Sequence, residues 1–81
     1  MYYVYILKSL RDGKYYYGCT SNLETRLKSH NSGKVRSTKS RRPLILHYYE
    51  EFESKPEALK REHFFKSVAG NIWLKEQGII W

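Results

Sequence analysis

The chain has 81 residues, with 15 lysines and arginines against 8 acidic residues and a formal net charge of +7. This length suits one domain over residues 1–81, and an aromatic content of 16% excludes a mainly disordered chain. The single cysteine, Cys19, has no disulfide partner, and the absence of a signal peptide or an apolar run of about 18 residues predicts a cytoplasmic protein with no membrane partner.

The first elements in chain order form a predicted β-hairpin. Residues 2–8 are mostly β-branched and aromatic, which is typical of a strand, and residues 14–19 are expected to return beside them. Arg11-Asp12-Gly13 lies between the two runs and is a turn signal. Because side chains alternate along a strand, Tyr5 and Val4 are expected to point to opposite faces of the sheet.

A first helix is predicted after the hairpin. The pattern Ser21-Asn22-Leu23-Glu24 indicates a capping box, and Gly33 is expected to stop the helix. At about 100° per residue, Arg26 and His30 fall on the same stripe as the two leucines of this helix. An arginine directed toward a sheet is destabilising unless it has a partner or a function, so both residues are candidates for a functional site.

The segment that follows, residues 34–42, is strongly basic and contains no acid. A cationic loop beside a tyrosine-rich body is typical of a protein that binds a phosphate backbone. The alternative is a solvated loop whose charge only keeps the protein in solution. The predicted nucleic-acid-binding residues of this segment are Lys34, Arg36, Lys39, Arg41 and Arg42.

A third strand and a second helix complete most of the predicted fold. The strand spans residues 43–50, with a proline at its first position, where a missing donor is tolerated. The helix is predicted from about residue 56 to residue 69. Ser54 and Glu57 have the capping-box spacing at its start, and Gly70 is expected to end it.

A short last helix is predicted over residues 71–77, with residues 79–81 docked onto the body. The order strand, strand, helix, strand, helix, helix predicts an α/β (α+β) fold with a three-stranded, mostly antiparallel sheet flanked by helices. Glu62 lies in the middle of the predicted buried stripe of the second helix. It is a candidate functional carboxylate, and the alternative is a structural ion pair with Lys66 or Arg26.

These positions together suggest a phosphate site. An arginine and a glutamate on different helices would face a pair of tyrosine-rich strands. An arginine offers a planar fork to a phosphate, a glutamate offers oxygen ligands to Mg²⁺, and a tyrosine hydroxyl can transfer a proton.

At these residues the sequence resembles the GIY-YIG endonuclease family, especially its small stand-alone single-domain members. Tyr3-Val4-Tyr5 resembles the first motif triplet, and Tyr16-Tyr17-Gly18 resembles the second. The motif tyrosines are 11 residues apart, and Arg26 follows the second by 10. His30 and Glu62 match later positions of the family pattern. The sequence departs from the motif twice, with Tyr3 in place of glycine and Tyr17 in place of isoleucine.

The resemblance implies the GIY-YIG fold and a metal-dependent endonuclease that hydrolyses phosphodiester bonds in DNA, in repair or processing of structured DNA. Its implied cofactor is Mg²⁺ or Mn²⁺, held by Glu62. By the same resemblance Arg26 would stabilise the phosphate in the transition state. Tyr5 would be the general base and Tyr16 would orient water or phosphate, while His30 would contact phosphate or assist the proton transfer.

Two other classes of function stay open at this point. One is a non-catalytic nucleic-acid binding module with the same fold, and the other is an interaction module whose basic loop docks on an acidic protein. The residues do not distinguish duplex, branched, damaged or single-stranded DNA from RNA. They also leave open the oligomeric state and which tyrosine acts as the general base.

Overall fold

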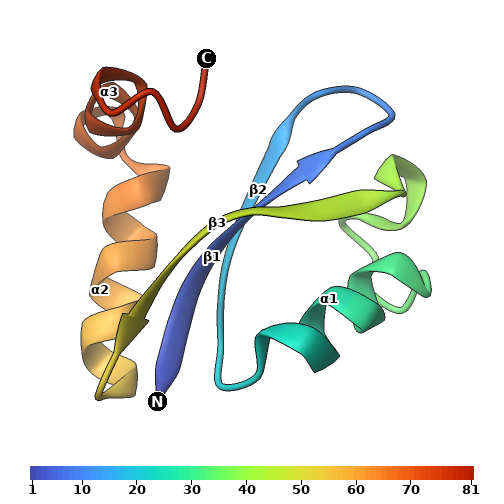
Figure 1. The fold of residues 1–81 in the computed structure, drawn as a ribbon, viewed down its shortest axis with the longest axis horizontal. Coiled ribbons are helices and arrows are strands. Elements are labelled where there is room, and N and C mark those ends of the chain that lie inside the picture. The colour runs from blue at the N-terminus through green and yellow to red at the C-terminus, as the bar shows by residue number, and fades with distance from the viewer.

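A computed structural model describes all residues, 1–81, and confirms the predicted order of elements (Figure 1). The strands and helices are β1 (Tyr2–Ser9), β2 (Tyr15–Thr20), α1 (Leu23–Asn31), β3 (Leu44–Phe52), α2 (Lys55–Lys66) and α3 (Val68–Glu76). A single 3₁₀ turn, η1 (Lys39–Arg41), precedes β3. None of the helices is both long and apolar enough to cross a bilayer.

The sheet has three antiparallel strands in the order β2-β1-β3, so the hairpin and the antiparallel sheet are confirmed. The central strand β1 is buried from Val4 to Leu7, because it has a neighbour at both edges and helices on both faces. Its middle residue, Tyr5, pairs with Gly18 of β2 and Tyr49 of β3. This register places the two tyrosine motifs side by side.

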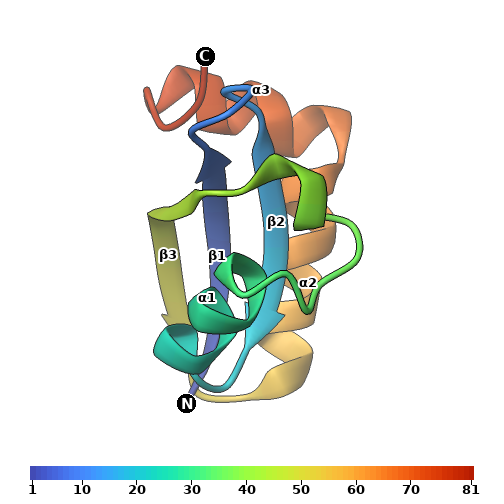
Figure 2. The same cartoon turned by 90° about the vertical axis from the view of Figure 1, so that its right-hand side faces the viewer.

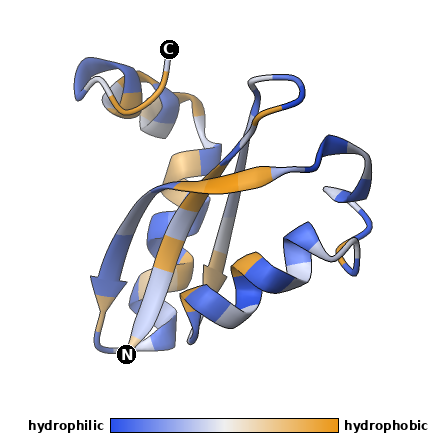
Figure 3. Ribbon diagram, turned by 45° about the vertical axis from the view of Figure 1, so that its right-hand side comes forward, coloured by the Kyte–Doolittle hydropathy of each residue, from blue (hydrophilic) through white to orange (hydrophobic).

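Helices cover both faces of the sheet. Figure 2 shows α1 in front of the strands and α2 behind them. Val4 and Ile6 pack against α2 and α3, whereas Tyr5 and Leu7 pack beneath the leucines of α1. The alternation of side chains along β1 therefore divides the core into two clusters. In Figure 3 the central strands carry hydrophobic colour, while the segment between α1 and β3 is largely hydrophilic.

The start of α1 differs from the predicted capping box. Asn22, not Ser21, is the N-cap, and its side chain accepts a hydrogen bond from the Thr25 amide at 3.1 Å. The prediction was wrong by one residue because serine and asparagine are both good caps and stand next to each other. Gly33 follows the helix with φ of +83°, a left-handed conformation that glycine adopts without strain.

The second helix is shorter than predicted. It ends at Lys66, and Ser67 separates it from α3, so the predicted stop at Gly70 was wrong. The Ser67 hydroxyl accepts a hydrogen bond from the Gly70 amide at 3.0 Å and donates to the Phe64 carbonyl at 2.6 Å. Gly70 is needed inside α3 because a Cβ there would collide with the backbone of Phe64.

The segment after α3 docks only in part. The Ile79 amide bonds to the Leu74 carbonyl, and Ile80 is 3% exposed in the core. His47 on β3 also bonds to the Ile79 carbonyl through Nε2. Trp81 lies beyond these contacts and is 85% exposed, so the prediction that it docks was wrong.

Candidate active site

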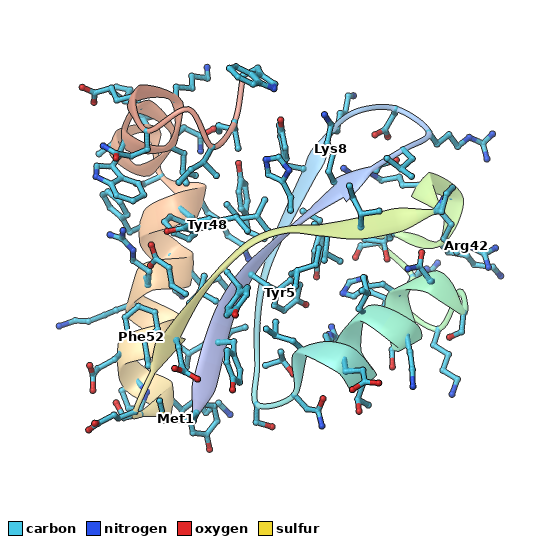
Figure 4. The ribbon with its side chains drawn as sticks, viewed as in Figure 1. Met1, Tyr5, Lys8, Arg42, Tyr48 and Phe52 are labelled. Carbon is cyan, nitrogen blue, oxygen red and sulfur yellow. The ribbon has the colours of Figure 1, made fainter.

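Tyr5 lies at the centre of the candidate site, between the sheet and α1 (Figure 4). Its side chain is 1% exposed, and its ring and hydroxyl lie against Gly18 on the neighbouring strand. A Cβ at position 18 would collide with the Tyr5 hydroxyl. The glycine of the second triplet therefore makes room for the tyrosine of the first.

Arg26 and His30 reach the Tyr5 hydroxyl from α1. The Arg26 Nε donates to Tyr5 Oη at 3.2 Å, and His30 Nε2 lies 3.1 Å from the same oxygen. The two residues are four apart, which places both on the side of the helix that carries Leu23 and Leu27. The helical spacing thus predicted correctly that they face the sheet.

Tyr16 on β2 completes the aromatic side of the site. Its ring meets the His30 ring edge to face, with the centroids 5.0 Å apart. The pKa of the Arg26 guanidinium is raised, first by its hydrogen bond with Tyr5 and further by Tyr16, against the opposing effect of burial. Arg26 therefore stays charged between two tyrosines, of which Tyr16 is partly exposed and Tyr5 is buried.

Burial sets the protonation of the inner residues. Burial raises the pKa of Tyr5, the Arg26 hydrogen bond and charge oppose this rise, and the charges of Tyr16 and Glu62 add to it. The pKa of His30 is lowered from 6.5 to about 4, first by burial and then by the Arg26 charge. His30 is therefore neutral at pH 7, and its side chain is fully buried.

The low pKa of His30 predicts acid sensitivity of the fold. The unfolded chain takes up a proton near pH 6.5 and the folded chain only near pH 4, so lowering the pH favours unfolding. Urea titrations should show about 3 kcal/mol of stability lost between pH 7 and pH 4 through this residue. The loss should disappear in His30→Gln and persist in His63→Gln, which changes an exposed histidine of α2. Equal losses in all three proteins would contradict the prediction.

Glu62 lies on α2, on the other side of the sheet from α1 (Figure 2). Its side chain is 15% exposed, and Lys66 Nζ lies 2.8 Å from Oε2. The ion-pair alternative with Lys66 is therefore present, whereas Arg26 bonds to Tyr5 instead. Burial is the main cause of the raised pKa of Tyr5 and of Cys19, and the Glu62 charge adds to both. No group of three or more His, Cys, Asp or Glu side chains is arranged as a metal site.

Comparison with known proteins identifies the family. The family model for the GIY-YIG catalytic domain matches residues 1–75. The chain belongs to the GIY-YIG family. It is therefore a member of a family of nucleases, and the match spans Tyr5, Tyr16 and Gly18.

The relatives of this GIY-YIG protein are small UPF0213 proteins. The UPF0213 protein of Bacillus licheniformis is 48% identical over 69 residues, which cover 84% of this chain and 70% of the relative. That of Staphylococcus haemolyticus is 45% identical over 75 residues, 91% of this chain and 90% of the relative. The solution NMR structure of a UPF0213 protein from Bacillus halodurans superposes with a TM-score of 0.55 at 37% identity, covering 95% of this chain and 85% of that one.

The basic segment of the GIY-YIG domain divides into exposed and structural cations. Arg41 is only partly exposed; its Nε lies 3.3 Å from Asp12 Oδ2, and a second nitrogen donates to the Tyr15 carbonyl at 3.3 Å. These contacts hold the β1–β2 turn, so Arg41 is not a free cation. The exposed cations of the segment are Lys34, Arg36, Lys39 and Arg42.

Two residues near this segment were missed by the sequence analysis. Arg11, in the hairpin turn, lines an open groove together with Lys39 and Arg42. Thr38 is fully buried, and its Oγ1 lies 2.7 Å from His30 Nδ1. The signal for Thr38 was an uncharged, hydrogen-bonding residue in the middle of a cationic run. The signal for Arg11 was only its charge in an exposed turn.

Proposed function

We propose that this GIY-YIG protein is a Mg²⁺- or Mn²⁺-dependent endonuclease that hydrolyses phosphodiester bonds in DNA, with branched or damaged DNA among its substrates. The observation that carries the proposal is the Tyr5 hydroxyl, which lies between a charged Arg26 and a neutral His30. A hydroxyl in this position can transfer a proton next to a group that binds phosphate.

Tyr5 is the proposed general base because its own proton has an acceptor. As Tyr5 Oη takes a proton from the attacking water, its hydroxyl proton passes to His30 Nε2, 3.1 Å away. Tyr16 is more exposed, but its hydroxyl makes no side-chain hydrogen bond to a proton acceptor. We propose that Tyr16 orients the water or the phosphate.

Arg26 is the proposed phosphate-stabilising group. Its Nε bonds to Tyr5, which leaves the two terminal nitrogens of the guanidinium as further donors. A preorganised charge of this kind contributes about 3 kcal/mol to transition-state stabilisation. The same bond fixes the orientation of the guanidinium before substrate arrives.

The residues present fit a metal held by Glu62. Mg²⁺ keeps several waters and binds through one or two carboxylates together with substrate phosphate, so one glutamate is sufficient. Lys66, the ion-pair partner of Glu62, is 54% exposed and can turn away into solvent. When bound, the metal would supply positive charge to the phosphate and the leaving oxygen. A single carboxylate predicts weak metal binding until nucleic acid is present.

The experiment that tests the proposed function is a cleavage screen. Duplex, branched, abasic and single-stranded DNA, and RNA of the same sequences, would be incubated with the protein in Mg²⁺, Mn²⁺ or EDTA. We expect cleavage of at least one DNA structure with either metal and none in EDTA. Binding without cleavage of any substrate would overturn the proposal in favour of a nucleic-acid binding module.

Salt dependence tests the DNA-binding part of the proposal. Each duplex phosphate neutralised contributes about −0.9 to the slope of log affinity against log salt concentration. Replacing Arg36, Lys39 and Arg42 by alanine should flatten this slope by up to about 3 units for a labelled duplex in EDTA. The control is the double alanine variant of Lys60 and Lys75, exposed cations of α2 and α3, which should leave the slope unchanged. An unchanged slope in the triple variant would place the DNA elsewhere.

A further inference from the structure

A buried series of hydrogen bonds connects α1 and the Tyr5 side chain of β1 to the basic segment, residues 34–42. It begins at Arg26 Nε, passes through Tyr5 Oη and both ring nitrogens of His30, and ends at Thr38. Tyr5, His30 and Thr38 are each at most 1% exposed. Thr38 Oγ1 in turn lies 3.4 Å from the Val35 carbonyl, to which it donates.

The donors in this chain can be assigned by counting protons. Arg26 Nε carries a hydrogen, so Tyr5 Oη accepts from it, and the single Tyr5 proton is left to donate to His30 Nε2. A neutral His30 then carries its proton on Nδ1, which donates to Thr38 Oγ1, and Thr38 donates to the Val35 carbonyl. Every buried donor is satisfied in this direction.

The opposite direction leaves a buried proton without an acceptor. If His30 carried its proton on Nε2, that nitrogen would donate to Tyr5 Oη, which already accepts from Arg26. The Tyr5 proton would then have no partner in an enclosed space. An unsatisfied buried donor is destabilising by about 1–3 kcal/mol, so the first direction is favoured.

We infer that Thr38 is a positioning residue, whose hydroxyl holds His30 in the Nδ1–H tautomer and so keeps the Nε2 lone pair directed at the Tyr5 hydroxyl. The tautomer assignment stands on the geometry of the folded protein, and its catalytic consequence rests on the proposed nuclease function. The same segment that carries the exposed cations therefore also supports the proton acceptor.

This tautomer permits a proton relay from the attacking water through Tyr5 to His30. A water O–H bond breaks as the water oxygen bonds to phosphorus, and the proton goes to Tyr5 Oη while the Tyr5 proton goes to His30 Nε2. The P–O bond to the leaving oxygen breaks with its electron pair on that oxygen, which is protonated from solvent. His30 is then an imidazolium beside the Arg26 charge and returns its proton through Tyr5 to solvent.

The test replaces the Thr38 hydroxyl and reads the tautomer directly. Long-range ¹H–¹⁵N NMR of the free protein at pH 7 distinguishes a protonated from a bare ring nitrogen. We expect wild type to show His30 with protonated Nδ1 and bare Nε2. Thr38→Val, which is nearly isosteric, leaves one buried donor unpaired in either tautomer, so His30 should no longer hold only the Nδ1–H form, and Thr38→Ser should restore the wild-type pattern. Thr25→Val is the control, since its hydroxyl is exposed on α1 and makes no hydrogen bond.

Cleavage provides the second readout. Thr38→Val should lower kcat by about 10²-fold with KM little changed, and Thr38→Ser should recover most of it. A protonated Nε2 in wild type would overturn the inference even if Thr38→Val did not fold, and so would an unchanged tautomer in a folded Thr38→Val. If the tautomers are as expected but the wild-type protein cleaves no substrate, the tautomer assignment stands and the proposed nuclease function is refuted.

Discussion

Replacing Glu62 by glutamine is expected to abolish metal-dependent cleavage while leaving the fold and nucleic-acid binding intact. Glutamine keeps the shape of the side chain but removes the negative charge that would hold a divalent cation. Cleavage with Mg²⁺ should fall at least about 10²- to 10³-fold, the size expected for loss of a preorganised electrostatic group. Binding to a labelled duplex in EDTA should be equal or slightly tighter, because one negative charge near the phosphate is gone.

The control for this prediction is Glu24→Gln. Glu24 forms an i,i+4 ion pair with Lys28 on α1, which matches the spacing of Glu62 and Lys66. Both members of the Glu24–Lys28 pair are exposed. Each variant should lose only about 0.5 kcal/mol of folding stability, and only Glu62→Gln should lose cleavage. Normal cleavage by Glu62→Gln would refute the metal assignment. Unfolding of that variant would show that Glu62 is a structural ion-pair residue.

Tyr5→Phe is expected to lose about 10²- to 10⁴-fold in kcat while still binding substrate. The ring continues to pack against Gly18, and only the hydroxyl between Arg26 and His30 is removed. Folding stability should fall by about 1–3 kcal/mol, because two buried donors or acceptors lose their partner. The measurements are single-turnover cleavage with Mg²⁺ and urea unfolding of the same samples.

Two further variants serve as comparisons for Tyr5→Phe. Tyr49→Phe changes the exposed tyrosine paired with Tyr5 on β3, and it should cleave and fold as wild type does. Tyr16→Phe should lose less activity than Tyr5→Phe, because the proposed role of Tyr16 is orientation. If Tyr16→Phe is the inactive variant and Tyr5→Phe is nearly normal, Tyr16 is the base and the proton path through His30 is wrong.

Most of the fold could be predicted because it follows from local periodicity. The alternation in β1 correctly assigned Val4 and Tyr5 to opposite faces, and the helical period placed Arg26 and His30 on one side of α1. The break between α2 and α3 was predicted at Gly70 but lies at Ser67, because a lone glycine in a helical pattern reads as a stop. Here Gly70 is instead required by a close approach of the Phe64 backbone.

The sequence by itself determined the order of elements, the two tyrosine triplets and the polar residues that face the sheet. All of these depend on spacing along a strand or helix, which backbone geometry fixes within a few residues. Only the tertiary structure decided the partners of the loop residues. Arg41 bonds to Asp12, 29 positions away, and Thr38 lies buried against His30. Both contacts form because the basic segment packs back onto the hairpin and α1. The sequence marked Thr38 only as an uncharged residue among cations and gave no sign that Arg41 turns inward, so the exposed cations and the buried residues of this segment could be separated only in three dimensions.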